Sequence, residues 1–421
     1  MSEACALLIH PNPDNGLLDS ILPICNAVVL SPQRHSSQQS AQRNSRVTQY
    51  WYTPGQDLLE LAIHICRAHK INAVPPLWEG MVESVSAITA ALGLSGNPLS
   101  ATQSSRDKYL ASLRFAEHKI PHPRTKLCDA ALDRPAQIES DAEYPFIVKL
   151  PRSTNSHSVA LIRSREELSE TLDVFRRLYR PDSPNRLSGL YLSNSGRQPF
   201  LVQDYVAGLE LNIDLLYTAA DHRILGIFEK YPMTGPTFEE VQSVYPVNLD
   251  QEALNLCIST AVNAVRALGA VDGAAHVELR MSNQGPAVIE VALRPGGFYT
   301  PRAIRYLTGV DPIAALTKLL LNHTLPQLDL LPKDRACLYG AVNVAHEGRI
   351  KTIFSDDFAR RTRNLLEWEI LKRPGDWITP LPAGTDYHLA RFILGGEFRE
   401  QLETTAEIIR RSITVEMEAP S

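Results

Sequence analysis

Long apolar runs are absent from this chain of 421 residues. No stretch approaches the ~18 consecutive apolar residues that a membrane-spanning helix needs, so we expect no membrane partner. The amino-terminal segment MSEACALLIHPNPD has an acid at position 3 and only a short apolar stretch. This composition argues against a secretory signal.

Cysteine is scarce and scattered. Six cysteines occur, with no CxxC pair and no histidine cluster, at positions 5, 25, 66, 128, 257 and 337. Such spacing argues against a zinc or disulfide framework and is typical of reduced, buried thiols. We therefore expect a cytoplasmic protein.

An excess of positive charge is also missing. The chain has 42 lysines and arginines against 47 aspartates and glutamates, a formal net charge of −5. This balance argues against a nucleic-acid partner. Hydrophobic residues make up 44% and charged residues 21%, as in ordinary globular proteins, and the length allows two or three domains with a core each.

Strand-like and helical segments alternate over the first hundred residues. The strand-like runs are 4–10, 26–32 and 71–77, and the helical ones are 55–70 and 78–97. This alternation predicts a small α/β domain with a parallel sheet over about 1–100. From about 125 the chain changes to strands and polar loops, with a helix over 165–179.

Residues 276–297, HVELRMSNQGPAVIEVALRPGG, carry two glutamates in alternating runs on either side of a turn-like SNQGP. Period-2 alternation around such a break predicts a hairpin. With a loop at 283–285, Glu278 lies directly across from Glu290, although like charges facing each other on a sheet are unfavourable. A hard cation such as Mg²⁺ between the carboxylates would remove the repulsion. The alternative is a solvated sheet face with two unrelated acids.

An apolar strand in YPFIVKLPRSTNSHSVAL ends at Lys149, and a small polar loop at 153–158 follows it. Backbone N–H groups of such a loop can surround phosphate oxygens, with the lysine as a point charge. The alternative is a lysine that is simply exposed at the end of a strand.

In FLVQDYVAGLELNIDL an apolar strand runs into Gln203, Asp204, Tyr205 and Val206, followed by a glycine turn and Glu210. A hinge of this kind can offer backbone groups to a purine and a carboxylate to ribose hydroxyls. The alternative is an ordinary edge strand with a glycine turn.

In this order the segments resemble the ATP-grasp superfamily over roughly 75–330, together with the dipeptide Asp107-Lys108 that opens a helix. The resemblance implies an ATP-grasp fold of mixed α/β and α+β class. It also implies three parts: a parallel-sheet pre-ATP-grasp domain over 1–100, a linker helix and mobile lid subdomain over 101–206, and a catalytic domain with a small terminal subdomain over 207–421.

The same resemblance implies roles for individual residues. ATP and Mg²⁺ would be the cofactors, with Mn²⁺ as an alternative metal. Glu278 and Glu290 would bind the metal, and Lys149 would be catalytic as well as phosphate-binding. The residues implied to bind ATP are Lys108, Lys149, Ser156, His157, Ser158, Gln203, Asp204, Tyr205, Val206, Glu210 and Leu279.

Two features depart from that family's pattern. Its phosphate loop is usually glycine-rich, whereas 152–158 contains no glycine, which gives the backbone less freedom. Many members have an asparagine metal ligand two residues after the second acid, where this chain has Ala292. Water or another side chain would then complete the metal shell.

The pattern E-x-A-x-R-x-x-G-F over 290–298 is similar to the L-amino-acid ligases, the ATP-dependent dipeptide synthetases of this superfamily. The resemblance implies that Arg294 is catalytic and that Gly296, Gly297 and Phe298 join it in binding substrate. A guanidinium can hold a carboxylate or phosphate bidentately. The alternatives are a surface ion pair for Arg294 and core packing for Phe298.

Four other residues lie near these motifs. His276 is interpreted as a packing or supporting histidine rather than a base. Lys230, Phe238 and Glu239 fall where substrate-side loops lie in the similar ligases.

These features predict an ATP-dependent carboxylate–amine ligase that forms an amide or peptide bond through an acyl phosphate. Its partners would be small molecules, a carboxylate and an amine, at least one of them an amino acid. Two other hypotheses stay open: a carboxylase of this superfamily that activates bicarbonate, and a nucleotide-binding regulator without catalysis. A homodimer is also left open, because many relatives are dimers.

Overall fold

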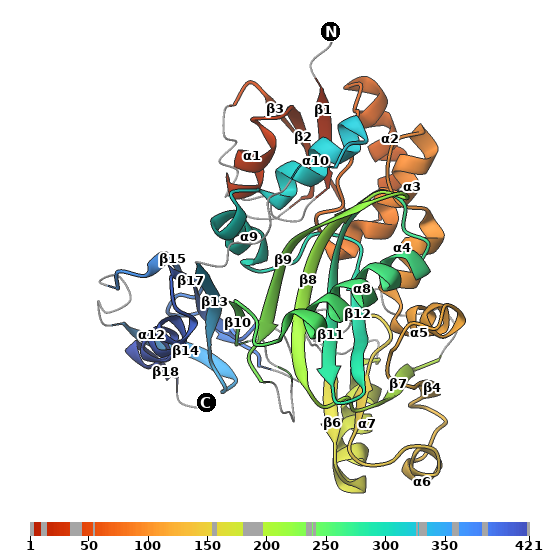
Figure 1. The fold of residues 1–421 in the computed structure, drawn as a ribbon, viewed down its shortest axis with the longest axis vertical. Helices are drawn as coiled ribbons and strands as arrows, with labels where there is room; N and C mark the ends of the chain where they lie inside the picture. The colour runs from red at the N-terminus through yellow and green to blue at the C-terminus, as the bar shows by residue number, and fades with distance from the viewer. Residues whose placement is uncertain are drawn as a thin grey trace.

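The computed structural model places four sheets in the part of the chain that it describes, with the long axis of the molecule vertical in Figure 1. The described residues are 4–9, 15–33, 44–53, 55–153, 158–179, 197–232, 238, 241–325, 327, 335–355, 362–380 and 386–418.

Three strands near the amino terminus form a parallel sheet of order β1-β2-β3. The strands are β1 (Cys5–Ile9), β2 (Asn26–Pro32) and β3 (Val47–Tyr52), and the neighbouring helices are α1 (Asn15–Ile21), α2 (Leu58–Ala68) and α3 (Val82–Leu92). All of β1 and most of β2 are buried, as is usual for strands covered on both faces. The predicted parallel sheet is confirmed.

The strand predicted at 71–77 is wrong. These residues, all of which the structure describes, form only one bridge, between Ala6 and Ala73. Pro75 and Pro76 lack backbone N–H groups and cannot extend a ladder of hydrogen bonds. The chain continues instead into the 3-10 turn η1 (Glu79–Met81).

Two short helices, α4 (Leu99–Arg106) and α5 (Lys108–Glu117), meet at Asp107. The backbone of Asp107 is extended, and its carboxylate accepts hydrogen bonds from two N–H groups in the first turn of α5. Such a cap satisfies N–H groups that the helix leaves unpaired. It also fixes Lys108 at the first position of α5, where its N–H donates to the carbonyl of Pro151 (2.9 Å).

A small antiparallel sheet of order β4-β7-β5-β6 occupies the lower part of Figure 1. Its strands are β4 (Thr125–Asp129), β5 (Phe146–Lys149), β6 (Val159–Ile162) and β7 (Pro199–Asp204), with the helices α6 (Pro135–Glu139) and α7 (Arg165–Leu178). Helix α7 packs the face formed by Leu168, Leu172 and Phe175 against Phe146 and Phe200 of the sheet. This sheet therefore has its own core, and Lys149 lies at the end of its strand β5.

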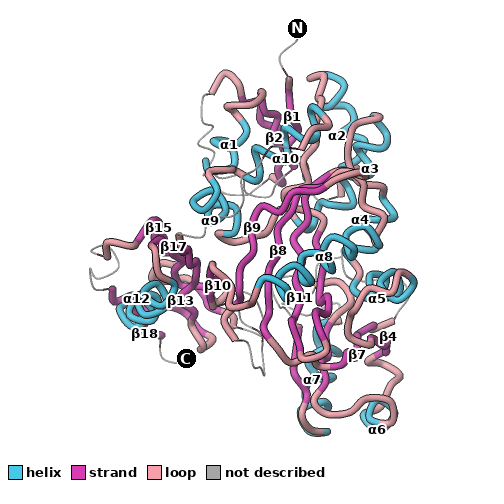
Figure 2. The backbone as a smooth tube through the Cα atoms, in the orientation of Figure 1, coloured by secondary structure: helices cyan, strands magenta, loops and turns pink. Residues whose placement is uncertain are grey.

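An antiparallel sheet of eight strands, in the order β12-β11-β8-β9-β10-β13-β17-β15, forms the middle of the molecule. Its first five strands are β8 (Leu209–Tyr217), β9 (His222–Lys230), β10 (Gln242–Tyr245), β11 (Gly273–Ser282) and β12 (Gly285–Ala292). Helix α8 (Gln251–Ala267) covers one face of β11 and β12 with Cys257, Ala261 and Val265 (Figure 2). The side chains of the opposite face are thus available for a site.

Helices α9 (Thr300–Thr308) and α10 (Pro312–Asn322) follow the hairpin. Ile313 and Leu321 of α10 pack against the amino-terminal sheet. The helix pair therefore joins the large sheet to the amino-terminal unit, as Figure 1 shows.

The carboxy-terminal residues complete the large sheet and add a small one. The large sheet receives β13 (Ala336–Asn343), β15 (Leu365–Ile370) and β17 (His388–Gly396). A separate carboxy-terminal sheet consists of β14 (Gly348–Ser355), β16 (Trp377–Ile378) and β18 (Ile413–Met417). Helix α12 (Arg399–Ser412) packs Leu402, Ala406 and Ile409 into the core shared with these strands.

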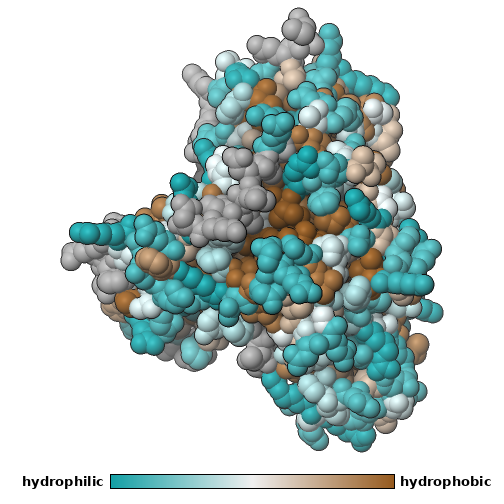
Figure 3. All heavy atoms as spheres, viewed as in Figure 1, coloured by the Kyte–Doolittle hydropathy of each residue, from teal (hydrophilic) through white to brown (hydrophobic). Residues whose placement is uncertain are grey.

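Helices and sheets together confirm the predicted mixture of α/β and α+β structure. In Figure 3, hydrophilic side chains cover much of the visible face, and hydrophobic ones gather near its middle. Within the described ranges, no helix is both long and apolar enough to cross a membrane. The proposed boundaries near 100 and 206 stay predictions.

Candidate active site

A cavity of about 380 Å³ lies where the small sheet β4–β7 meets the open face of the large sheet. Residues from α5 and from both sheets, including the carboxy-terminal strand β17 of the large sheet, line it. The predicted site residues among them are Lys108, Lys149, Gln203, Asp204, Tyr205, Val206, Glu210, Glu278, Glu290, Arg294, Gly297 and Phe298. The folded chain thus brings together side chains that are up to 190 positions apart.

Of the predicted residues that the structure describes, Gly296, Ser158 and Leu279 are not among those lining the cavity. Gly296 lies behind the lining, and Ser158 is buried beside it with φ 61°, a backbone conformation that favours glycine. Ser156 and His157 lie outside the described residues, as does Glu239.

Both predicted phosphate-binding lysines are buried. Lys149 is 3% exposed and Lys108 is 7% exposed, so the alternative of an exposed Lys149 is wrong. Burial and the nearby charge of Lys108 lower the pKa of Lys149 to about 8. Lys108 Nζ donates to the carbonyl of Ser153 (2.9 Å) and forms an ion pair with Glu290 (3.1 Å). Two ammonium groups therefore converge on one wall.

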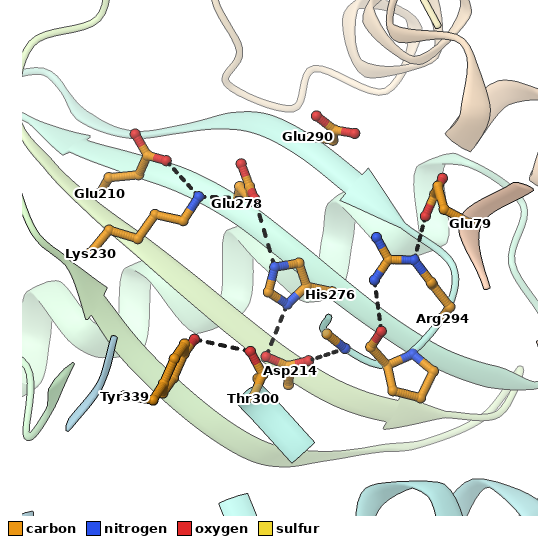
Figure 4. A network of polar contacts seen from close by, with 12 residues as sticks. Glu79, Glu210, Asp214, Lys230, His276, Glu278, Glu290, Arg294, Thr300 and Tyr339 are labelled. Atoms are coloured by element: carbon orange, nitrogen blue, oxygen red, sulfur yellow. Dashed lines mark hydrogen bonds and ion pairs between the residues drawn. The ribbon is translucent and has the colours of Figure 1, made fainter. Parts of the chain in front are cut away.

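The hairpin pairs the two glutamates as predicted. Glu278 and Glu290 are direct cross-strand partners, and the two-residue turn is Asn283-Gln284 because Ser282 pairs with Gly285. A bulge at Ile289 follows this pair. Figure 4 shows both carboxylates on the same face of the sheet. The two acids are therefore cross-strand neighbours on one face of the sheet, and their role as metal ligands stays a prediction.

Each glutamate has a lysine of its own. Glu278 Oε1 lies 3.0 Å from Lys230 Nζ, and Glu290 Oε1 lies 3.1 Å from Lys108 Nζ. Burial would raise the pKa of Glu278, but Lys230 and His276 lower it well below its ordinary value. Each carboxylate therefore lies next to a lysine ammonium group.

An amide oxygen next to this pair has no hydrogen-bond partner. Asn212 on β8 is directly opposite Glu278, is 1% exposed, and buries its Oδ1 without a partner among the described residues. Leaving a buried acceptor unpaired costs free energy. In the described part of the chain, no group of three or more His, Cys, Asp or Glu side chains is arranged to hold a metal ion.

The hinge at 203–206 is held by Arg280, which the sequence did not single out. Arg280 donates Nε to Glu210 Oε2 (2.7 Å) and Nη1 to the carbonyl of Val206 (2.9 Å), and it lies over the ring of Tyr205 (5.3 Å to the centroid). Glu210 also pairs with Lys230 (3.0 Å). Its carboxylate is therefore shared by two cations.

The prediction for Leu279 does not agree with this geometry. Leu279 is fully buried in the core under α8, because successive strand residues point to opposite faces. Arg280, one residue later, lines the cavity instead. Its place two residues after Glu278 was the signal that could have identified it.

Arg294 is fixed by an acid from the amino-terminal unit. Its Nε donates to Glu79 Oε2 and its Nη1 donates to the carbonyl of Pro295 (2.8 Å), as Figure 4 shows. Glu79 is 7% exposed and also binds Arg106 Nη1 (2.7 Å). Burial would raise the pKa of Glu79, but the two arginines lower it to about 2. Arg294 is therefore not a surface ion pair, and among the described residues its Nη2 has no hydrogen-bond partner.

His276 connects the sheet to the loop after Arg294. Its Nδ1 lies 3.0 Å from Asp214 Oδ2, and the other oxygen of Asp214 accepts the N–H of Gly296 (2.8 Å). Burial would lower the pKa of His276, but Asp214 and Glu278 raise it to about 9. The ring is thus charged at neutral pH, which agrees with a supporting role rather than that of a base.

Residues 142–302 match the family model described as an ATP-grasp domain. This segment is an ATP-grasp domain. It holds Lys149, the hinge, both glutamates and Arg294, whereas Lys108 precedes it.

Several curated relatives of this chain are named ligases or synthases. Carnosine synthase 1 of Homo sapiens is 24% identical over 330 residues, which are 75% of this chain but 39% of that protein. Alanine–anticapsin ligase of Bacillus subtilis (strain 168) is 22% identical over 286 residues, 64% of this chain and 57% of that protein. The chain thus spans less than half the length of the human relative.

Among solved structures, an L-amino acid ligase from Bacillus licheniformis superimposes with a TM-score of 0.84 at 18% identity. The superposition covers 100% of both chains. The shared fold therefore includes the amino-terminal and carboxy-terminal parts of the chain.

Beyond the ATP-grasp domain, three residues near the start of β17 also line the cavity: Tyr387, His388 and Arg391. They are about 90 positions after Phe298, and no local pattern marks them.

Phe238, from the segment singled out in the sequence, is 6% exposed and packs with Ile147 and Leu161.

Proposed function

We propose that the chain is an ATP-dependent carboxylate–amine ligase that forms an amide through an acyl phosphate and releases ADP and phosphate. One observation carries this proposal: a single cavity contains two buried lysines, two facing glutamates and an arginine whose orientation is fixed. The names of the curated relatives support C–N bond formation.

In this proposal the hinge and the lysines bind ATP. The backbone of Tyr205 and Val206 lies beside the adenine, and Glu210 lies beside the ribose. Lys108 and Lys149 neutralise the phosphates, which is worth most in a site that excludes water. The core of the small sheet and the apolar wall at Phe238 provide that exclusion.

Glu278 and Glu290 would hold Mg²⁺, or Mn²⁺ in its place. Their oxygens face each other across neighbouring strands, and Mg²⁺ is commonly bound by one or two carboxylates together with phosphate oxygens and water. Asn212 Oδ1 is a third oxygen, and it supports the fit because Ala292 provides none. When bound, the ion would reduce the effective negative charge of the phosphates.

Arg294 would hold the carboxylate substrate through Nη2. A carboxylate oxygen attacks the γ-phosphorus, and the bond to ADP breaks. The neutral amine nitrogen then attacks the acyl carbon, phosphate leaves with the electron pair of the C–O bond, and the proton lost from nitrogen is taken up by the departing phosphate. Charge neutralisation and positioning are enough for both steps, so no nucleophilic side chain is needed.

The test is a phosphate-release screen of the purified chain with MgATP, amino-acid pairs and small carboxylates, with mass spectrometry of the products. We expect release that needs a carboxylate, and a product lighter than its two substrates together by one water. Arg294→Gln should abolish it, whereas Arg349→Gln, at an exposed ion pair, should not. Release that depends on bicarbonate, or ATP hydrolysis independent of any carboxylate, would contradict the proposal.

A further inference from the structure

Two polar side chains of strand β17 face the cavity, and the chemistry proposed above does not use them. His388 and Arg391 are three residues apart, so regular alternation would send them to opposite faces. A β-bulge brings both side chains to the same face. Val342 pairs with Ala390 and Asn343 pairs with His388, so Leu389 has no partner residue on β13. Leu389 and Ala390 are buried, while His388 and Arg391 line the cavity. Bulges that redirect side chains are frequent next to active sites.

His388 presents a hydrogen-bond acceptor. Its Nδ1 lies 2.8 Å from the amide oxygen of Asn343, which can only accept, so Nδ1 carries the proton. Burial lowers the pKa of His388 to about 4, so the ring is neutral at neutral pH and Nε2 has a free lone pair. Among the described residues, Nε2 has no hydrogen-bond partner. The ring packs on Phe298 of the substrate loop, 5.5 Å between centroids.

Arg391 presents a donor. Its Nε and Nη2 both bind Glu369 Oε2, at 2.8 and 2.7 Å, and its guanidinium lies 4.6 Å from the ring centroid of Tyr299. These contacts fix the group in one plane and leave Nη1 without a partner in the described part of the chain. An arginine held in this way is well suited to a carboxylate.

We propose that His388 and Arg391 form the subsite for the amine substrate, and that this substrate is an amino acid with a free carboxylate. The amino group donates to His388 Nε2, and the carboxylate accepts from Arg391 Nη1. Phe298 lies in the loop that begins at Arg294 and contacts His388, so the amine faces the carboxyl group held by Arg294. This subsite rests on the proposed ligase function, because that function defines which substrate carries the amine.

The proposal is tested with pairs of amine substrates that differ only in the carboxylate: glycine and glycinamide, L-alanine and L-alaninamide, L-leucine and L-leucinamide. We expect wild type to have a KM at least about tenfold lower for the acids that it uses, the size expected for one charged hydrogen bond. Arg391→Gln should remove this preference by raising the KM for the acids alone. His388→Asn should raise the KM for both members, and His388→Gln, whose amide oxygen replaces Nε2, should restore part of the loss.

Arg302→Gln is the matched control, because Arg302 also stacks on Tyr299 and pairs with an acid, Glu367, but does not line the cavity. It should leave every KM within about twofold, below the effect of one lost hydrogen bond. Equal use of acids and amides by wild type, use of the amides but of no acid in the set, or an equal effect of Arg391→Gln on both members would overturn the subsite.

A binding measurement separates this inference from the ligase function. Saturation-transfer NMR with L-alanine and L-alaninamide, on the protein loaded with Mg²⁺ and ADP, needs no turnover. Stronger binding of the acid to wild type than to Arg391→Gln supports the subsite, and identical binding overturns it. Absence of carboxylate-dependent phosphate release in wild type contradicts the ligase function alone.

Discussion

Lys149 shows how burial changes the charge of a site residue. Because its pKa is lowered to about 8, the side chain loses its proton near pH 8 when no ligand is present. Phosphate oxygens favour the charged form, so ATP binding requires this lysine to be protonated.

The affinity for ATP should therefore fall as the pH rises through 8. We expect the Kd of wild type to increase by about tenfold from pH 7 to pH 9, as for one group with a pKa near 8. Lys149→Arg should bind with little change over this range, because arginine stays charged. Titration calorimetry at pH 7, 8 and 9 measures both, and a flat profile in wild type would rule out this role for Lys149.

Glu79 couples stability to the orientation of Arg294. Its pKa in the folded protein is about 2, below the ordinary 4.5, so the charged carboxylate stabilises the fold at pH values above 4.5. The size is about 3 kcal/mol, and it decreases as the pH falls from 4.5 towards 2.

Glu79→Gln should thus lower the unfolding temperature at pH 7 by more than at pH 3.5. It should also raise the KM for the carboxylate substrate, since Arg294 loses the acid that orients it. Glu83→Gln, at a half-exposed ion pair with Arg152, is the control and should have a smaller effect on both. Equal behaviour of the two variants would show that Glu79 has no special link to Arg294.

At the scale of elements, the close approach of the Gly296 backbone to its neighbours helps to hold the loop 294–298. A methyl group on Gly296 would lie 2.8 Å from Asp214 Oδ1, His276 Nδ1 and Thr300 Cγ2, whereas one on Gly297 would have no atom within 4 Å. The hydrogen bond from Gly296 to Asp214 depends on this close approach.

Gly296→Ala should destabilise the protein by about 1–3 kcal/mol, the usual cost of overpacking. Gly297→Ala should cost almost nothing and provides the matched control one residue away. Denaturant unfolding of both variants measures the difference. Similar losses would mean that the loop adapts to the methyl group.

Local patterns made much of the ATP-grasp domain predictable. The hairpin follows from period-2 alternation within 276–297, and the start of α5 follows from the cap at Asp107. The error at Leu279 came from assigning a cavity role to a residue of the wrong parity. The error at 71–77 came from reading apolar residues as a strand despite two prolines.

Distant contacts made the rest unpredictable. Glu79 and Arg294 are 215 positions apart and meet only because η1 packs beside the hairpin. His388 faces the cavity through a bulge that depends on pairing with β13, which its own segment does not encode. Such residues acquire meaning from tertiary structure rather than from a motif.

At the scale of the whole molecule, the cavity is bounded by the small sheet β4–β7 and by the large sheet, which includes β17, so a bound nucleotide would link separate cores. Anything that binds the folded state alone stabilises it, by about 2.7 kcal/mol at a concentration of 100 times Kd. Mg²⁺ should add to the effect of ADP only when both glutamates are present.

We therefore expect ADP with Mg²⁺ to raise the unfolding temperature by more than ADP alone. Glu290→Gln should remove this difference and the Mg²⁺-dependent turnover, whereas Glu347→Gln, on an exposed turn, should retain both. Thermal unfolding monitored by fluorescence is sufficient. A normal response to Mg²⁺ in Glu290→Gln would contradict the metal assignment.

The acyl phosphate can be tested by following oxygen atoms. A carboxylate substrate labelled with ¹⁸O in both oxygens is turned over with MgATP and an amino acid, and the phosphate is examined by mass spectrometry. Attack of the carboxylate on the γ-phosphorus predicts one ¹⁸O atom in each phosphate released. Unlabelled phosphate, or label recovered in AMP, would contradict it.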